Sequence, residues 1–221
     1  EINQLNKLLN PERPFIAIVA GEKADKIDAL KILAKKAYKI LIGGILANTL
    51  LKAKGYDIGS SKFDEEAFTV AKELIDSGSK KLILPVDNIV ADKFDKDANT
   101  KVVTGNIPKE WMVMDIGPET VKLYKEELKN ARAVFWAGPL GVFEMQKFST
   151  GTKEIGEFLG NLNATVIIGG GDTAASINDF ELTGKIAYVS TGGGASLEFI
   201  EKEGKLPALV ALEEAYKKFN E

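Results

Sequence analysis

The chain has 221 residues, a formal net charge of −3 and 45% hydrophobic residues, which is typical of one large or two small globular domains. It contains neither cysteine nor histidine, which excludes disulfides, thiolate or histidine metal sites, and Ser-His-Asp or Cys-His catalysis. The acidic balance argues against general nucleic-acid binding, and no apolar run approaches membrane-spanning length, so we expect no nucleic-acid or membrane partner. No secretory signal peptide is visible, and we expect a cytoplasmic protein.

Short apolar runs alternate with helix-length amphipathic segments along the whole chain, without a linker. Residues 15–19 are typical of the runs, which predict buried strands because every position is apolar. Residues 24–37 are typical of the predicted helices, with Ile27, Leu30 and Leu33 on one face. The predicted strands are 15–19, 39–42, 81–84, 133–136, 164–168 and 186–189, with a short outlying strand at 100–104; the predicted helices are 2–9, 24–37, 45–54, 64–76, 118–130, 150–159, 173–180, 195–203 and 208–219.

Strands that alternate with helices require right-handed parallel crossovers. The pattern therefore predicts an α/β fold, a doubly wound Rossmann-like parallel sheet of about six strands with helices on both faces. Glycine at a strand end lets the backbone approach a ligand closely, and a following helix offers free N–H groups to an anion. Ligands in such sheets bind outside the carboxyl ends of the strands, so we expect nucleotide or phosphate chemistry there. Five of the apolar runs stop at a glycine: Gly21, Gly43, Gly138, Gly169 and Gly192.

Residues 169–174 match the loose dinucleotide fingerprint GxGxxA. An NAD-dependent dehydrogenase would also need an acid at the end of the next strand to bind the ribose hydroxyls. Residues 188–192 contain no acid, so the dehydrogenase is the weaker hypothesis. Asp172 has two interpretations that stay open: a helix N-cap, or an oxygen ligand for Mg²⁺ on nucleotide phosphates.

Other candidate positions also have both a structural and a functional interpretation. Lys23 and Lys26 follow Gly21 and belong either to a solvated lysine face or to a group that neutralises a transferring phosphoryl group. The same choice applies to Glu144 (a lysine pair or a ribose ligand), residues 192–196 (a tight turn or a phosphate cradle), and Trp111, Met112 and Met114 (core packing or adenine contacts).

Five ordered segments together resemble the C-terminal, nucleotide-binding half of phosphoglycerate kinase: residues 84–94, 115–120, 135–144, 166–176 and 189–209. The resemblance covers nearly the whole chain, and its GGGDTA and STGGGAS motifs are specific as an ordered pair. It implies that residues 1–14 are the remnant of an interdomain helix and linker, 15–205 the nucleotide-binding domain and 206–221 a C-terminal helical tail. The N-terminal acid-binding domain is then absent.

The resemblance implies binding of MgADP or MgATP, with Mg²⁺ as cofactor. The implied reaction is reversible phosphoryl transfer between 1,3-bisphosphoglycerate and ADP, which is a step of glycolysis. The acid substrate, 3-phosphoglycerate or 1,3-bisphosphoglycerate, would bind through the missing half. We therefore expect a monomer that binds nucleotide with little turnover alone.

The resemblance also assigns roles to individual residues. Asp172 is the metal and nucleotide ligand, and Thr173 lies beside the phosphates. Lys23 is catalytic, Lys26 binds nucleotide and Glu144 binds the ribose. Gly21, Gly43, Gly44, Met114, Pro139 and Val142 form the wall of the adenine pocket, Gly170 and Gly171 lie next to the nucleotide phosphates, and Gly192, Gly193 and Gly194 begin the helix that meets the transferring phosphoryl group.

Three positions depart from the family's pattern. Lys23 and Lys26 are three residues apart, where the family usually has four. Glu22 occupies the place of a small residue, and Ala137 that of a common asparagine. These departures leave an alternative open, a non-catalytic nucleotide-binding regulatory module.

Overall fold

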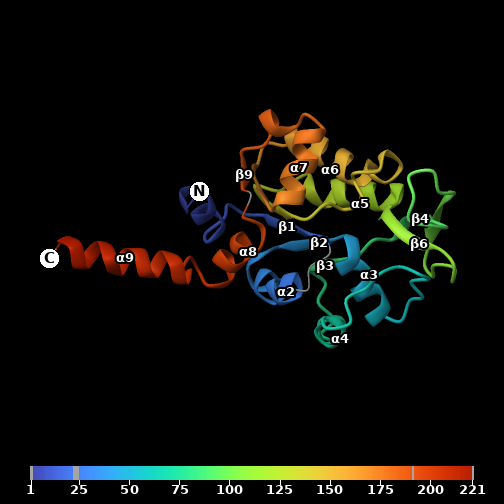
Figure 1. Cartoon of the computed structure of the whole chain (residues 1–221), viewed down its shortest axis with the longest axis horizontal. Helices are drawn as coiled ribbons and strands as arrows, with labels where there is room; N and C mark the ends of the chain where they lie inside the picture. Colours follow the sequence, from blue (N-terminus) through green and yellow to red (C-terminus); the bar gives the residue numbers. More distant parts are fainter. Residues whose placement is uncertain (1, 22–24, 191, 221) are drawn as a thin grey trace.

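The computed structural model describes residues 2–21, 25–190 and 192–220 and contains a six-stranded parallel sheet (Figure 1). Its strand order is β3-β2-β1-β7-β8-β9. If the six strands of this sheet are numbered 1 to 6 along the chain, their order is 3-2-1-4-5-6, which is that of doubly wound folds. The predicted fold class is therefore confirmed. The order reverses between β1 and β7, which is where such folds bind ligands. The strands are β1 Phe15–Val19, β2 Lys39–Ile42, β3 Leu82–Ile83, β7 Ala133–Ala137, β8 Thr165–Gly169 and β9 Tyr188–Ser190.

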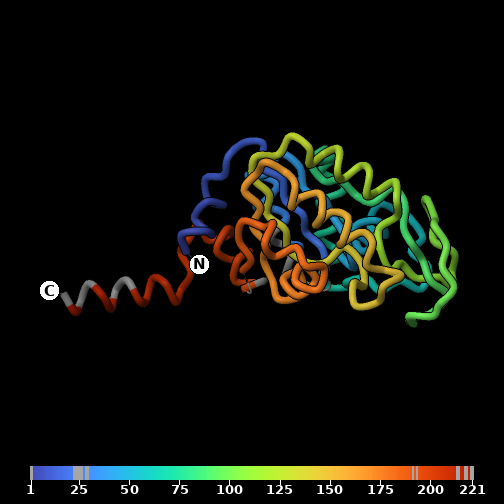
Figure 2. Tube along the Cα trace, turned by 90° about the horizontal axis from the view of Figure 1, so that it is seen from above, coloured from blue at the N-terminus to red at the C-terminus, as the bar shows by residue number. Residues whose placement is uncertain are grey.

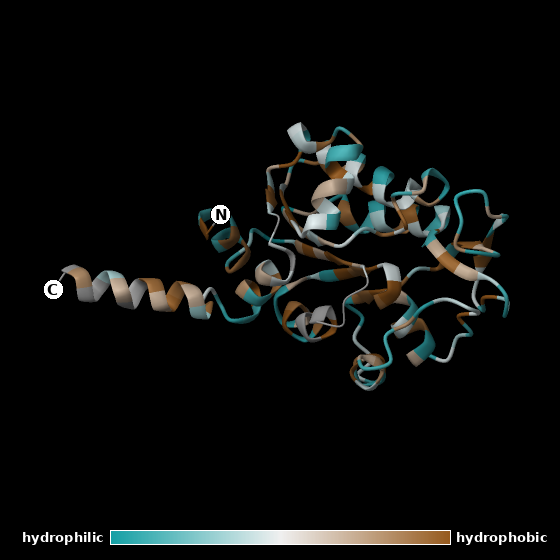
Figure 3. Ribbon diagram, in the orientation of Figure 1, coloured by the Kyte–Doolittle hydropathy of each residue, from teal (hydrophilic) through white to brown (hydrophobic). Residues whose placement is uncertain are grey.

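Helices cover both faces of this sheet because its strands are apolar on both faces. Phe15 and Ala17 of β1 pack into one buried cluster with α2, α3, α4 and α8, while Ile16 and Ile18 pack into another with α5, α6 and α7. Hydrophobic residues accordingly line the strands between the two helical layers (Figure 3). The helices are α1 Ile2–Leu5, α2 Asp25–Lys36, α3 Gly44–Ala53, α4 Phe68–Asp76, α5 Pro118–Leu128, α6 Thr150–Gly160, α7 Gly171–Asp179, α8 Gly193–Glu201 and α9 Pro207–Asn220, with short 3₁₀ turns at Asn6–Leu8, Gln146–Phe148 and Thr183–Lys185.

A second, antiparallel sheet lies at one end of the molecule, with the order β5-β4-β6 (Figure 1). The outlying strand predicted at residues 100–104 is β5, Thr100–Thr104. Its partners β4, Asp87–Ala91, and β6, Met112–Ile116, were not predicted. Polar residues such as aspartate and asparagine are depleted in strands, and they open β4, so the local pattern favoured a loop.

The helix predicted over residues 64–76 begins only at Phe68. Asp64 makes a turn instead: its carboxylate accepts the N–H of Ala67 at 3.0 Å, and its own N–H donates to the Thr49 hydroxyl at 2.9 Å. Asp64 therefore anchors a loop to α3.

The two terminal segments differ in how they meet the core. Leu5 and Leu8 are buried in the same cluster as β1. In contrast, α9 projects away from the body of the molecule (Figure 2). Leu212 on this helix is 67% exposed and Phe219 is 93% exposed. Within the described ranges, none of the helices has the length and apolar content needed to cross a membrane.

Candidate functional site

The carboxyl edge of the parallel sheet is formed by the loops that follow β1, β2, β7, β8 and β9. These loops are joined by backbone hydrogen bonds: Ala20 N donates to Ala137 O at 2.8 Å, and Gly170 N donates to Ser190 O at 2.9 Å. The structure therefore brings together the glycines at which the apolar runs stop, which are Gly21, Gly43, Gly138, Gly169 and Gly192.

The loops after β1 and β2 pack so closely that only glycine fits. Gly44 has a φ of +60°, and a Cβ there would lie 2.6 Å from the Gly21 nitrogen. A Cβ on Gly43 would lie 2.6 Å from the Leu140 side chain. The loops after β1, β2 and β7 thus pack directly against one another at the carboxyl edge.

Helix α7 begins at this edge with an open end. Its N-cap is Gly170, which has a φ of +111°. The first intrahelical bond runs from Ala174 N to Gly170 O, so the N–H groups of Gly171, Asp172 and Thr173 are the unpaired ones of the helix start. Asp172 lies in the first turn and is not the N-cap, so the N-cap interpretation is wrong.

Asp172 and Thr173 point in different directions. The Asp172 side chain is exposed. The Thr173 side chain is buried, and its hydroxyl accepts the N–H of Gly138 at 2.7 Å. The Thr173 hydroxyl therefore ties α7 to the end of β7, and its backbone N–H is the group that remains directed out of the helix start.

Helices α3 and α8 start at the same edge and also have glycine at the N-cap. Gly43 precedes α3 and Gly192 precedes α8, and neither has a side chain that accepts the first N–H groups. Ser196 N donates to Gly192 O at 2.7 Å as α8 begins. Three helix starts therefore present uncapped N–H groups and a positive dipole end at the carboxyl edge.

Helix α5 differs because its start is satisfied from within the chain. The buried Asp87 carboxylate accepts Thr120 N at 2.7 Å and Glu119 N at 3.1 Å. Pro118, the first residue of α5, has no N–H to satisfy. Sequence analysis assigned no role to Asp87, whose signals were its position after the run 82–86 and its place in the segment 84–94.

Helix α6 is also capped by a remote side chain, the carboxyl group of Asp115 on β6. Its oxygens accept Gly151 N and Ile116 N, each at 2.8 Å. Burial raises the pKa of the Asp115 carboxyl to about 8, and the negative charge of Glu154 adds to the increase, although the two N–H groups oppose it. Asp115 belongs to the 115–120 motif, but no role was predicted for it.

Two of the residues expected at the adenine wall are joined by a backbone hydrogen bond. Val142 N donates to Met114 O at 2.9 Å, which joins the loop after β7 to strand β6. Met114 is buried in the small core beside this sheet, with Met112 partly buried against it. Pro139 is half-buried and Glu144 exposed in the same loop.

The expected cation positions are only partly covered by the structure. Lys23 lies outside the described residues, and Lys26 falls in the first turn of α2. Within the described part of the chain, no three acidic side chains gather into a group that could hold a metal ion. An exposed carboxylate such as that of Asp172 fits Mg²⁺ that is bound mainly by substrate phosphates and water.

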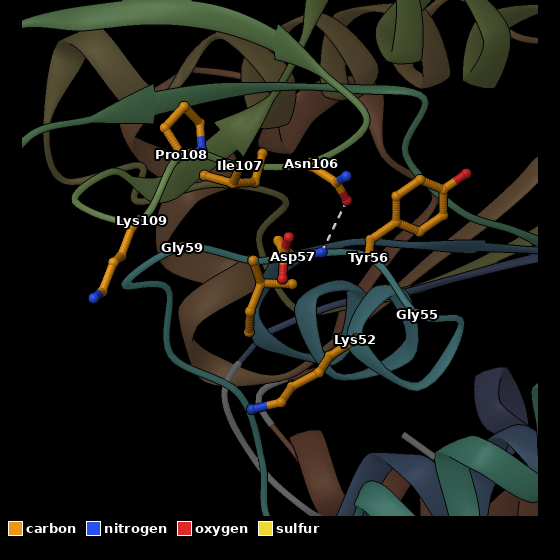
Figure 4. Close-up of a pocket in the computed structure, with 10 residues that line it drawn as sticks. Lys52, Gly55, Tyr56, Asp57, Gly59, Asn106, Ile107, Pro108 and Lys109 are labelled. Carbon is orange, nitrogen blue, oxygen red and sulfur yellow. Dashed lines mark hydrogen bonds between the residues drawn. The ribbon is translucent and has the colours of Figure 1, made fainter.

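An open pocket of about 730 Å³ lies elsewhere, at the C-terminal end of α3 (Figure 4). The ten residues of α3 span about 15 Å, which separates this pocket from the helix start at Gly44. It is therefore distinct from the carboxyl edge. It is lined by Lys52, Gly55, Tyr56, Asp57, Ile58, Gly59, Asn106, Ile107, Pro108 and Lys109.

The fold and the carboxyl edge define a class of protein, the doubly wound α/β proteins with glycine-capped helix starts at one sheet edge. Comparison with known proteins narrows this class. The sequence model of the family described as phosphoglycerate kinase matches residues 1–204. The chain therefore belongs to the phosphoglycerate kinase family.

The chain is similar to curated proteins named phosphoglycerate kinase from lactic acid bacteria. It is 50% identical to that of Limosilactobacillus reuteri over 205 residues, which cover 92% of this chain and 51% of the relative. Among solved structures, it matches phosphoglycerate kinase from Coxiella burnetii with a TM-score of 0.87 and 40% identity, covering 94% of this chain and 55% of that one. The chain thus spans about half the length of the relatives it matches.

Proposed function

We propose that the chain is the nucleotide-binding half of a phosphoglycerate kinase. It binds MgADP or MgATP for reversible phosphoryl transfer between 1,3-bisphosphoglycerate and ADP. The observation that carries the proposal is the convergence of three glycine-capped helix starts, those of α3, α7 and α8, at the carboxyl edge. The carboxyl groups of Asp87 and Asp115 occupy the starts of α5 and α6, whereas the starts of α3, α7 and α8 are open in the described part of the chain and suit an anionic ligand.

In this proposal the adenine lies against Gly21, Gly44, Met114 and the loop that carries Pro139 and Val142. Glycine at the first two positions has no side chain that would stand between a flat ring and the backbone. Glu144 is exposed in the same loop, and we propose that it binds the ribose hydroxyls.

The phosphates then meet the N–H groups at the start of α7, with Asp172 beside them. Mg²⁺ supplies charge neutralisation and holds the phosphate oxygens in place. The side chains of Lys23 and Lys26 are proposed to share the neutralisation. Glycines 192–194, which cap and begin α8, are proposed to receive the transferring phosphoryl group.

The absence of histidine is compatible with this reaction. In the direction of ATP formation, the nucleophile is an ADP phosphate oxygen that is already charged, and in reverse it is a carboxylate. No general base is required, so the chain's contribution is positioning and electrostatic stabilisation.

Turnover needs the acid substrate, which the other half of such a kinase would bind. Orientation of two reactants can supply roughly 7–11 kcal/mol of a barrier. We therefore expect negligible kinase activity from this chain alone. A monomeric state and a cytoplasmic location stay predictions.

Calorimetric titration of the chain with MgADP tests the proposal, with NADH as the control ligand. We expect saturable one-to-one binding of MgADP and no binding of NADH. A folded chain that binds no MgADP would contradict the nucleotide role. NADH binding would favour the dehydrogenase instead, and kinase activity close to that of a complete enzyme would contradict the expected inactivity.

A matched pair of variants on α7 tests the role of Asp172. Asp172→Asn is expected to weaken MgADP binding about tenfold while leaving metal-free ADP binding nearly unchanged. Asp179→Asn removes the same charge from the other end of this helix, where Asp179 is also exposed, and should change neither. Equal losses in both variants would mean that only net charge matters.

A further inference from the structure

Asp115 is a buried carboxyl to which the proposed reaction assigns no task. Its side chain is 1% exposed. One carboxyl oxygen accepts the N–H of Ile116 on its own strand, and the other accepts the N–H of Gly151 in the first turn of α6. It therefore joins β6 to α6.

The carboxyl also contacts the loop after β7. A Cβ on Gly141 would lie 2.3 Å from the Asp115 Oδ1 atom, and a Cβ on Gly151 would lie 2.4 Å from it. The Asp115 carboxyl thus fills the space that these two glycines leave. Strand β6, the start of α6 and the loop meet at this one group.

The loop held at this point carries two of the residues proposed to meet the nucleotide, Pro139 and Val142. Val142 N donates to Met114 O, one residue before Asp115. On the other side, Leu140 N donates to the Thr152 hydroxyl at 3.0 Å. Asp115 therefore lies directly behind the contact between Val142 and Met114.

We propose that Asp115 is a positioning residue, which holds the loop of residues 138–143 against Met114 in the geometry that nucleotide binding requires. This inference rests on the proposed function of the carboxyl edge. Asp115 does not touch the nucleotide in this account; it acts through Gly141, Val142 and the start of α6.

The chain offers a matched control in Asp87. Both carboxyls are buried, and both accept backbone N–H groups at a helix start. Within the described part of the chain, the contacts of the Asp87 carboxylate are with Gly117, Glu119 and Thr120 at the start of α5, and none is with the loop after β7. An asparagine at either position accepts through one oxygen only, so each variant leaves at least one of these N–H groups without its acceptor.

The test is calorimetric titration of the whole chain with MgADP, alongside urea unfolding of each variant. We expect Asp115→Asn to weaken MgADP binding at least about tenfold, and Asp87→Asn to change it by less than about twofold, although both destabilise the fold. Equal affinities of the two folded variants would overturn the positioning role. If the unmodified chain did not bind MgADP, the proposed function on which this inference rests would be overturned instead.

A second pair of variants keeps Asp115 in place. Gly151→Ala puts a methyl group against the carboxyl, whereas Gly156→Ala on the same helix puts one against Leu182, away from the loop. We expect Gly151→Ala to weaken MgADP binding severalfold more than Gly156→Ala does. Affinity that is unchanged in Gly151→Ala would overturn the inference even if Asp115→Asn does not fold.

Discussion

Asp115 makes the stability of the fold depend on pH. Its pKa is raised to about 8 in the folded chain, mainly by burial, whereas an unfolded aspartate titrates near 3.8. The folded state therefore binds this proton more tightly than the unfolded state. The resulting stability is fully present below about pH 4 and is lost as the pH rises through 8.

Between pH 6 and 8 we expect this group to remove roughly 2 kcal/mol from the free energy of unfolding. Urea unfolding at both pH values measures the change. In Asp115→Asn the side chain no longer titrates. The difference in unfolding free energy between pH 6 and pH 8 should therefore shrink by that amount. If the unfolding free energy changed equally between the two pH values in the unmodified chain and in Asp115→Asn, the raised pKa would be contradicted. The Glu154 carboxylate, which faces Asp115 and pairs with Lys125 at 2.6 Å, is retained in both.

At the scale of single residues, the sequence predicted which segments meet at the carboxyl edge better than it predicted side-chain directions. Asp172 and Thr173 are neighbours in one motif, yet the first is exposed and the second is buried against Gly138. Burial of Thr173 depends on where β7 ends relative to α7. The position of α7 relative to the end of β7 is set by tertiary packing, and no local sequence pattern predicts it.

At the scale of elements, Tyr124 on α5 joins the ends of two strands. Its buried hydroxyl donates to Ile42 O at 2.5 Å and lies 3.2 Å from Ile83 O. Burial raises the pKa of Tyr124, so the group stays neutral and keeps its donor. Tyr124→Phe leaves these buried carbonyls short of a donor and should cost about 1–2 kcal/mol of unfolding free energy.

Urea or thermal unfolding measures this loss. The control is Tyr38→Phe, since Tyr38 is 58% exposed and its substitution should change stability by less than about 0.5 kcal/mol. Similar stability of the two variants would mean that the Tyr124 hydroxyl contributes nothing beyond its ring.

The strands of the parallel sheet were predictable because each is a short apolar run buried on both faces. The strands β4 and β6 were not, since β4 begins with Asp87 and β6 contains Asp115. Both aspartates are buried because they cap helices at positions distant in sequence. Asp87 and Thr120, for example, are 33 residues apart. No periodicity within a strand encodes such a partner.

At the scale of the whole molecule, the two terminal segments should contribute unequally to stability. Leu8 is buried at 1% exposure, so Leu8→Ala should cost about 2–5 kcal/mol. Leu212 on α9 is 67% exposed, so Leu212→Ser should change the free energy of unfolding by less than about 0.5 kcal/mol. Urea unfolding of both variants measures the contrast, and a large loss from Leu212→Ser would mean that α9 folds onto the core.

The strand order has a consequence for the chain as it is being synthesised. Strand β1 lies between β2 and β7, and β7 begins only at Ala133. At roughly 5–20 residues per second, a ribosome needs on the order of ten seconds to make the chain between them. During that time one side of β1 presents unpaired backbone groups and apolar side chains, as an edge strand does. The nascent chain should therefore be a target for chaperones until β7 has emerged and completed the sheet.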